Sequence, residues 1–257
     1  MEAAILCLSY LDILRDYSQA FFRPDRIVIS AAGNLEHEAF VNLVAKEFGA
    51  IDGASNKRAK DNIKAVRESK TKNKSIEQVH FCIGAPAYSQ HDDRKYILAI
   101  MDSILGGGMS SRLFQEIREN RGLAYAIGSY SASYNDTGLF AVYGGTSLEN
   151  LDEVLELIRT ECANLRDNNA SDVEIERGKN QIRGALVLGQ ESMSNRMSRM
   201  SKSELYFGRV ISTQEIVERI MRVSKDDIAG VAHELFEAPE FTYAAVGPFD
   251  KNGGSGS

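Results

Sequence analysis

An arginine and a tyrosine that can act together, Arg118 and Tyr125, stand seven residues apart where a helical pattern gives way to a strand pattern. From the end of a helix and the start of a strand, the two side chains can point into one cavity and offer hydrogen-bond donors to a carbonyl or an oxyanion. An Arg and a Tyr at this spacing are common, so a salt-bridged surface arginine beside a packed tyrosine is the alternative interpretation. The residue types alone leave both interpretations open.

A glycine run, Gly106, Gly107 and Gly108, precedes this pair and separates two helical patterns. Free backbone amides beside a helix can hold a phosphate. The chain, however, contains no G-x-x-x-x-G-K-[ST] motif, and the glycines follow a helix instead of a strand. We therefore predict a structural loop that ends one helix and lets the chain turn into the next. A phosphate- or nucleotide-binding protein is the competing hypothesis.

Metal-binding patterns are absent from the sequence. The four histidines are His37, His80, His91 and His233. No two of them are four residues apart, so the inverted zinc motif H-x-x-E-H does not occur. The three cysteines, Cys7, Cys82 and Cys162, are also far apart, which predicts buried thiols in a reducing compartment and neither a disulfide framework nor a C-x-x-C site. We expect no metal and no cofactor in this chain.

The composition predicts a globular fold that alternates helices and strands. The chain has 257 residues, 43% hydrophobic positions and a formal net charge of −6, with no apolar run near the roughly 20 residues that a membrane span needs. Hydrophobic periodicity and capping signals predict helices over 10–22, 40–48 and 96–105 and from residues 147, 171, 212 and 224 onward, and strands over 26–32, 79–83, 124–134, 139–144 and 241–247. Met193, Met197 and Met200 follow a helical spacing that is typical of core packing.

A strongly basic segment divides the chain. Between residues 57 and 74 there are eight basic and two acidic residues, a net charge of 8 − 2 = +6. Such a run can bind nucleic acid. It has no aromatic residues and is rich in Asn and Ser, so we predict a solvated linker over 57–75 and no nucleic-acid partner.

An internal repeat predicts the domain organisation. A helix, a proline and a strand lead from Ser9 to Gly33, and a similar series leads from Ser224 to Gly247, offset by 215 residues at the serine and 214 at the glycine. We expect a complete domain over 76–250, preceded by the C-terminal remnant of a related domain over 1–56. Residues 251–257 read as a Gly/Ser tail.

The segment from Leu105 to Tyr125 resembles the pitrilysin or insulinase-type zinc peptidases, the family that includes mitochondrial processing peptidase. Further resemblance lies in 22–34, 136–140, 174–179 and 245–248. The resemblance implies an α+β fold in which a sheet is backed by helices in two layers, built as homologous halves. It also implies that the first half holds zinc through H-x-x-E-H, whereas the second half has no metal, closes a chamber over the peptide and supplies an Arg and a Tyr. These match Arg118 and Tyr125.

The resemblance identifies the chain as the C-terminal, non-metal half of such a peptidase with the tail of its zinc half. It implies that zinc lies in the missing half and that the chain by itself does not hydrolyse peptides. We expect exposed apolar residues at the N-terminus, including Leu6, Leu8, Leu11 and Leu14, because their core partners are absent. Residues 1–56 would then bind a zinc-bearing half or a second copy. A non-catalytic scaffold of the same family is the alternative.

Overall fold

The computed structural model describes residues 2–53, 68–237 and 241–249 and divides the chain into two compact units. The N-terminal unit comprises residues 1–62 and 188–211, and the sheet unit comprises residues 63–187 and 212–257. Side chains before Tyr10 are not described, so the expectations for Leu6, Cys7 and Leu8 lie outside the described part. The same holds for the Gly/Ser tail and for residues 57–67 of the basic segment.

The described part of the N-terminal unit is helical. It contains α1 (Glu2–Phe21), the short η1 (Pro24–Arg26), α2 (His37–Phe48) and α6 (Met193–Phe207). The inclusion of α6 differs from the predicted domain bounds, because Ser30 Oγ donates a 3.0 Å hydrogen bond to the carbonyl of Met197 and ties the two segments together. The methionine prediction is wrong for Met193 and Met197, which are about 40% exposed.

The strand predicted over 26–32 does not form. Residues 27–32 follow η1 without regular structure, although several of them are apolar. A strand needs a neighbouring backbone to satisfy its N–H and C=O groups, and the described part of this unit contains no strand that could pair with it. The second copy of the repeat does form its strand, β5 (Thr242–Gly247), because β5 lies between two partners.

A five-stranded sheet in the order β1-β5-β2-β4-β3 is the centre of the sheet unit. Its other strands are β1 (Ser69–Asn73), β2 (Val79–Ala87), β3 (Ala124–Ser133) and β4 (Gly138–Thr146). The predicted hairpin is confirmed as the antiparallel pair β3 and β4. The linker prediction is wrong over 69–73, since these residues form β1 and pair in parallel with β5, from Ser69 opposite Tyr243 to Asn73 opposite Gly247.

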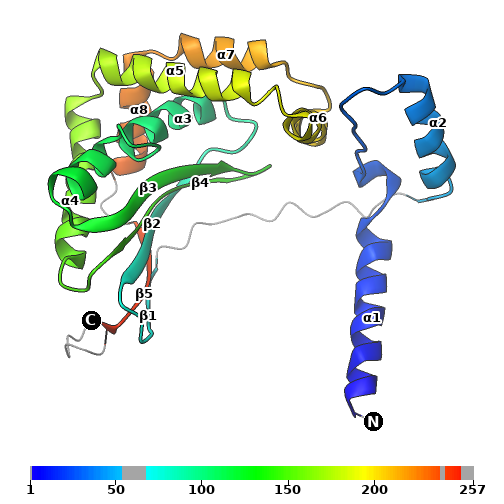
Figure 1. Ribbon diagram of the computed structural model, residues 1–257, viewed down its shortest axis with the longest axis horizontal. Coiled ribbons are helices and arrows are strands. Elements are labelled where there is room, and N and C mark those ends of the chain that lie inside the picture. Colours follow the sequence, from blue (N-terminus) through cyan, green and yellow to red (C-terminus); the bar gives the residue numbers. More distant parts are fainter. Residues whose placement is uncertain (1, 54–67, 238–240, 250–257) are drawn as a thin grey trace. The chain divides into compact units, whose positions relative to one another are not determined.

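Helices cover one face of this sheet (Figure 1). They are α3 (Arg94–Leu105), α4 (Leu151–Asn168), α5 (Asp172–Leu188), α7 (Thr213–Arg222) and α8 (Lys225–Phe236), with the π-helical turn η2 (Phe114–Asn120) before β3. Val79, Phe81 and Ile83 alternate along β2 toward the helices and are buried there. The fold is therefore α+β in two layers, a sheet backed by helices, as predicted.

Side-chain caps begin several of these helices where the sequence predicts them. Ser224 Oγ accepts from the Asp227 N–H at 3.2 Å while the Asp227 carboxylate accepts from the Ser224 N–H at 2.8 Å, a complete capping box. Ser212 Oγ accepts from the N–H of Glu215 at 3.0 Å in the same way at the start of α7. Helix starts are thus encoded locally, because a cap joins residues only three apart.

Candidate functional site

The segment that carries Arg118 is a π-helical turn held by the core. Leu113 and Ile117 are fully buried on its inner side. The turn ends at Asn120, and Gly122 follows it with a φ of 64°, the left-handed conformation that glycine adopts without strain. There the N–H of Gly122 donates to the Arg118 carbonyl at 3.1 Å and the N–H of Leu123 donates to the Ile117 carbonyl at 2.9 Å. The backbone of Arg118 is therefore fixed on both sides.

Tyr125 stands in a β-bulge at the start of the edge strand β3. Ala124 is opposite Thr146 and Ala126 is opposite Gly145, so Tyr125 is an extra residue with no partner on β4. A bulge of this kind re-aims a side chain away from its regular alternation. Tyr125 is 76% exposed, unusually high for an aromatic residue in a strand.

The structure brings Arg118 and Tyr125 together. The guanidinium of Arg118 lies 5.4 Å from the centre of the Tyr125 ring and 4.7 Å from the centre of the Phe114 ring. Its nearest carboxylate is that of Glu119, at 3.8 Å. Ring contacts use the faces of a guanidinium, whereas its N–H donors lie in its plane. The arrangement can therefore hold the side chain and still offer donors to an oxygen. The spacing of residues in the sequence predicted Arg118 and Tyr125 as a pair but did not predict that Phe114 contacts Arg118.

A charged pair anchors the segment just before the π-helical turn. Arg112 Nε donates to Glu174 Oε1 at 2.7 Å, Arg112 Nη2 donates to Glu174 Oε2 at 3.0 Å, and the two side chains are only 17% and 18% exposed. Ser171 completes the site, because its N–H and its hydroxyl both donate to Glu174 Oε2 at 2.8 Å. Burial acts to raise the pKa of Glu174, but the hydrogen bonds from Arg112 and Ser171 outweigh it and lower the pKa to about 2.

The glycine run packs closely against β3. Gly106 is the C-cap of α3, and a Cβ at this position would lie 2.3 Å from the backbone nitrogen of Ser129. The N–H groups of Gly106 and Gly107 both donate to the carbonyl of Asp102, at 3.0 and 2.9 Å. Because these two amides already donate to a carbonyl of the last turn of α3, they are not free to bind a phosphate, which argues against the phosphate-binding hypothesis.

A half-buried carboxylate lies at this junction of α3 and β3. The Asp102 carboxylate accepts hydrogen bonds from the hydroxyls of Ser129 and Ser131. Burial raises the pKa of Asp102, and the serine hydrogen bonds act against that rise. The carboxylate therefore joins the helix end to the strand and belongs to the support of the glycine run.

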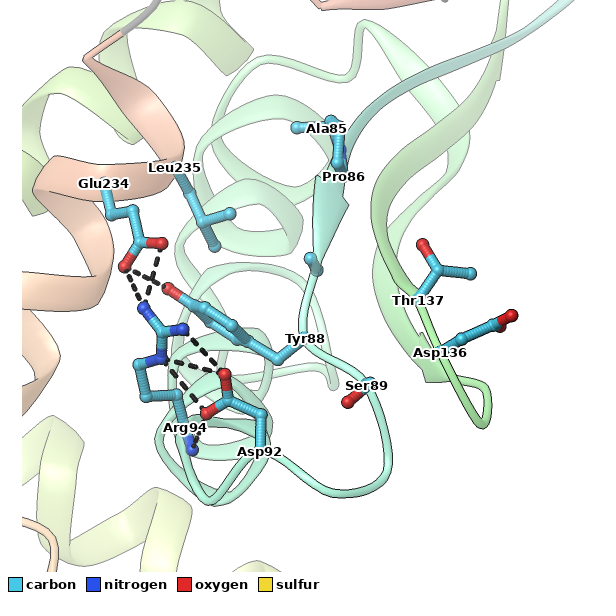
Figure 2. A pocket seen from close by; sticks show the side chains of 11 residues that line it. Ala85, Pro86, Tyr88, Ser89, Asp92, Arg94, Asp136, Thr137, Glu234 and Leu235 are labelled. Atoms are coloured by element: carbon cyan, nitrogen blue, oxygen red, sulfur yellow. Dashed lines mark hydrogen bonds and ion pairs between the residues drawn. The ribbon is translucent and has the colours of Figure 1, made fainter. Parts of the chain in front are cut away.

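A polar cleft of about 450 Å³ lies elsewhere in the sheet unit and was not anticipated from the sequence. Figure 2 shows Arg94 between the carboxylates of Asp92 and Glu234, with the Tyr88 ring beside it. Arg94 Nη2 lies 2.6 Å from Asp92 Oδ2, Arg94 Nη1 lies 2.7 Å from Glu234 Oε2, and the Tyr88 hydroxyl donates to Glu234 at 2.9 Å. Every charged group in this cluster has a partner, so the cluster connects α8 to the start of α3.

The electrostatics of the cleft fit this structural role. Burial, followed by the hydrogen bond to the Glu234 carboxylate, raises the pKa of Tyr88. The hydrogen bonds from Arg94 lower the pKa of Asp92. Both shifts favour the forms that make the hydrogen bonds, a neutral Tyr88 hydroxyl and an ionised Asp92 carboxylate. No short motif signals this arrangement, because Tyr88 and Glu234 are 146 residues apart.

No group of three or more His, Cys, Asp or Glu side chains that could hold a metal occurs in the described part of the chain. Cys162 is buried and Cys82 is half-buried, and both are free thiols. The described residues thus do not fit a zinc ion. Within the same residues, no helix is both long enough and apolar enough to cross a membrane.

Comparison with known proteins gives the class to which this two-layer α+β fold belongs. Residues 10–182 match the sequence model of a family described as the peptidase M16 inactive domain, and the chain belongs to this family. It is 36% identical over 237 residues to an uncharacterized zinc protease from Bacillus subtilis, covering 92% of this chain and 58% of the relative. It is 35% identical over 232 residues to one from Streptomyces coelicolor, covering 87% of this chain and 50% of the relative.

Solved structures show the same fold. A peptidase M16 inactive domain from Pseudomonas fluorescens superposes with a TM-score of 0.75 at 17% identity, over 84% of this chain and 52% of that chain. A protease from Helicobacter pylori gives a TM-score of 0.73 at 16% identity, over 84% of this chain and 54% of that chain. The chain thus spans about half the length of the relatives that it matches. Membership of the metallopeptidase family, in its non-metal half, is established by these findings.

Proposed function

We propose that the chain is the substrate-binding half of a zinc metalloendopeptidase and that it closes a chamber over the peptide. The observation that supports this proposal is the contact between Arg118 and Tyr125, which are seven residues apart yet meet at the exposed edge of the sheet. Arg118 would hold the carbonyl oxygen of the bound peptide, and the Tyr125 hydroxyl would donate to the oxyanion that develops there. Each donor aimed at such a charge contributes on the order of 10²-fold in rate.

Zinc would be held by the other half of the protease, since the described part of this chain has no ligand group for it. The chain by itself is then expected to bind peptides without hydrolysing them. Purified chain supplied with zinc should contain no stoichiometric metal and show no chelator-sensitive peptidase activity. Stoichiometric zinc together with chelator-sensitive peptidase activity in the purified chain would overturn the proposal.

Arg118→Ala and Tyr125→Phe test the assigned roles in a protease reconstituted with a zinc-bearing half. Each variant is expected to lower kcat by about 10²-fold with an unchanged melting temperature. Arg121→Ala is the matched control, because Arg121 lies three residues further on and pairs with Glu116 at 2.8 Å on the surface. Wild-type turnover in the Arg118 and Tyr125 variants would leave a non-catalytic scaffold as the better assignment.

We further propose that residues 1–56 bind the zinc-bearing half. Apolar side chains of α1 are largely exposed in the N-terminal unit, among them Tyr10 at 62%, Ile13 at 61% and Leu14 at 64%. Contiguous apolar surface of this kind marks an interface. Light scattering should find a complex with the zinc-bearing half that Leu14→Asp weakens. A second copy as the preferred partner, or a monomer that binds no hydrophobic dye, would refute this assignment.

A further inference from the structure

The sheet face opposite the helices carries a row of exposed side chains. Since Phe81 and Ile83 point to the core, Cys82 between them points to the open face, and the register places Tyr143 and Ala244 beside it on the neighbouring strands. Tyr143 is 46% exposed, and its ring lies 5.9 Å from that of Tyr130. The face thus presents aromatic and small residues in the same row.

A hollow of about 380 Å³ lies on this face because the residues of its floor are small. Gly84 is opposite Ala141 on β4 and opposite Thr242 on β5. Leu139 and the exposed Ala244 lie at its sides. No charged side chain is among the described residues that line it. A hollow of this size and lining suits one large uncharged side chain.

We infer that this hollow, hereafter the apolar pocket, takes a large apolar side chain, such as Phe or Leu, from the peptide that Arg118 and Tyr125 hold. The inference rests on the proposed function and adds a sequence preference to it. An ammonium or carboxylate group would lose its hydration in the apolar pocket without gaining a partner, whereas an apolar side chain is stabilised by leaving water.

The register gives the spacing between the two sites. Ala126, the residue after Tyr125, is opposite Gly145, and Ala141 in the apolar pocket lies four residues from Gly145 along β4. At about 3.3 Å for each residue, this is roughly 13 Å, with about 5 Å more for each strand crossed. An extended peptide therefore covers the distance in about four to five residues. Tyr143, halfway along this path on β4, would lie under the intervening residues.

Fluorescence anisotropy with the full chain tests the preference directly. Two labelled decapeptides of otherwise identical, uncharged sequence carry either one Phe or one Ser at the same position. The Phe peptide is expected to bind at least about tenfold more tightly, as burial of an aromatic side chain implies. Equal affinity for the two peptides would overturn the inference.

Ala244→Asp places a charge at the side of the apolar pocket without filling a buried site, because Ala244 is exposed. It should weaken the binding of the Phe peptide much more than that of the Ser peptide and so remove the preference for Phe. His80→Asp is the control, since His80 is exposed on the same face outside the apolar pocket. If both variants reduce the preference equally, the effect is a general one of surface charge and the inference fails.

Arg118→Ala separates this inference from the proposed function. It should weaken both peptides equally and leave the preference for Phe intact. An unchanged affinity for both peptides would count against the role of Arg118 while the preference for Phe still supported the apolar pocket. In the reconstituted protease, moving the Phe along the peptide should move the cleavage site with it at a constant separation of about four to five residues. A cleavage site that ignores the Phe would overturn the spacing.

Discussion

The pair of Arg112 and Glu174 should make the sheet unit sensitive to acid, and Glu174→Gln measures how much. The carboxyl has a pKa of about 2 in the folded chain against 4.5 in the unfolded chain. At roughly 1.36 kcal/mol for each factor of ten, this difference stabilises the folded state by about 3 kcal/mol at neutral pH. The side chain is 18% exposed, so solvent screening reduces this value only modestly.

The direction of the pH dependence follows from the lowered pKa. The stabilisation is fully present above the unfolded pKa of 4.5 and is lost as the pH falls through the interval between 4.5 and about 2. At pH 3 the wild-type chain should already have lost about 2 kcal/mol of it. Glu174→Gln cannot ionise, so the free energy of unfolding of wild type and variant should differ by up to about 3 kcal/mol at pH 7 and by about 1 kcal/mol at pH 3.

Urea unfolding followed by circular dichroism at the two pH values provides the assay. Glu156→Gln is the matched control, because its carboxylate is 71% exposed and lies 3.4 Å from Arg159, which is itself 58% exposed. This control should change the free energy of unfolding by less than about 0.5 kcal/mol at both pH values. A penalty for Glu174→Gln that stays constant between pH 7 and pH 3 would refute the electrostatic reasoning.

Three further changes test other parts of the sheet unit. Phe114→Leu removes one of the two rings beside Arg118, so kcat of the reconstituted protease should fall roughly tenfold with a smaller change of KM; an unchanged kcat would contradict the positioning role. Gly106→Ala brings a Cβ to 2.3 Å from a backbone nitrogen of β3, so urea unfolding should show a loss of at least about 2 kcal/mol, and a stable variant would refute the close approach. Tyr88→Phe removes the 2.9 Å hydrogen bond to Glu234 and should lower stability by about 1 kcal/mol in thermal unfolding at pH 7, whereas no shift would mean that the bond contributes nothing.

Local signals in the sequence predicted most elements of the sheet unit. The apolar period over 96–105 became α3, and Ser224 with Asp227 forms the expected capping box. The family resemblance around 105–125 is confirmed by the match to the M16 inactive domain. These signals succeed because helix periodicity, caps and tight turns depend on residues at most a few positions apart.

Strands were harder to predict from the sequence than helices. An extended segment forms a strand only where a neighbouring strand pairs with it. Residues 69–73 are exposed along their whole length and carry no apolar alternation, yet they form β1 beside β5, more than 170 positions later in the chain. Residues 27–32 have the apolar composition of a strand and form none. Strand propensity reflects packing against neighbours more than a preference of the backbone itself.

The sequence by itself determined the family, the order of the helices and of the strands other than β1 in the sheet unit, and the absence of an H-x-x-E-H zinc motif. Only the tertiary structure decided that Arg118 contacts the rings of both Phe114 and Tyr125. It also decided that Arg112 pairs with Glu174, 62 residues later, and that this pair anchors the segment just before the π-helical turn. The physical reason is range: caps and periodicity act within a few residues, whereas a bulge, a buried ion pair and the hollow over Gly84 exist only after distant strands and helices have packed together.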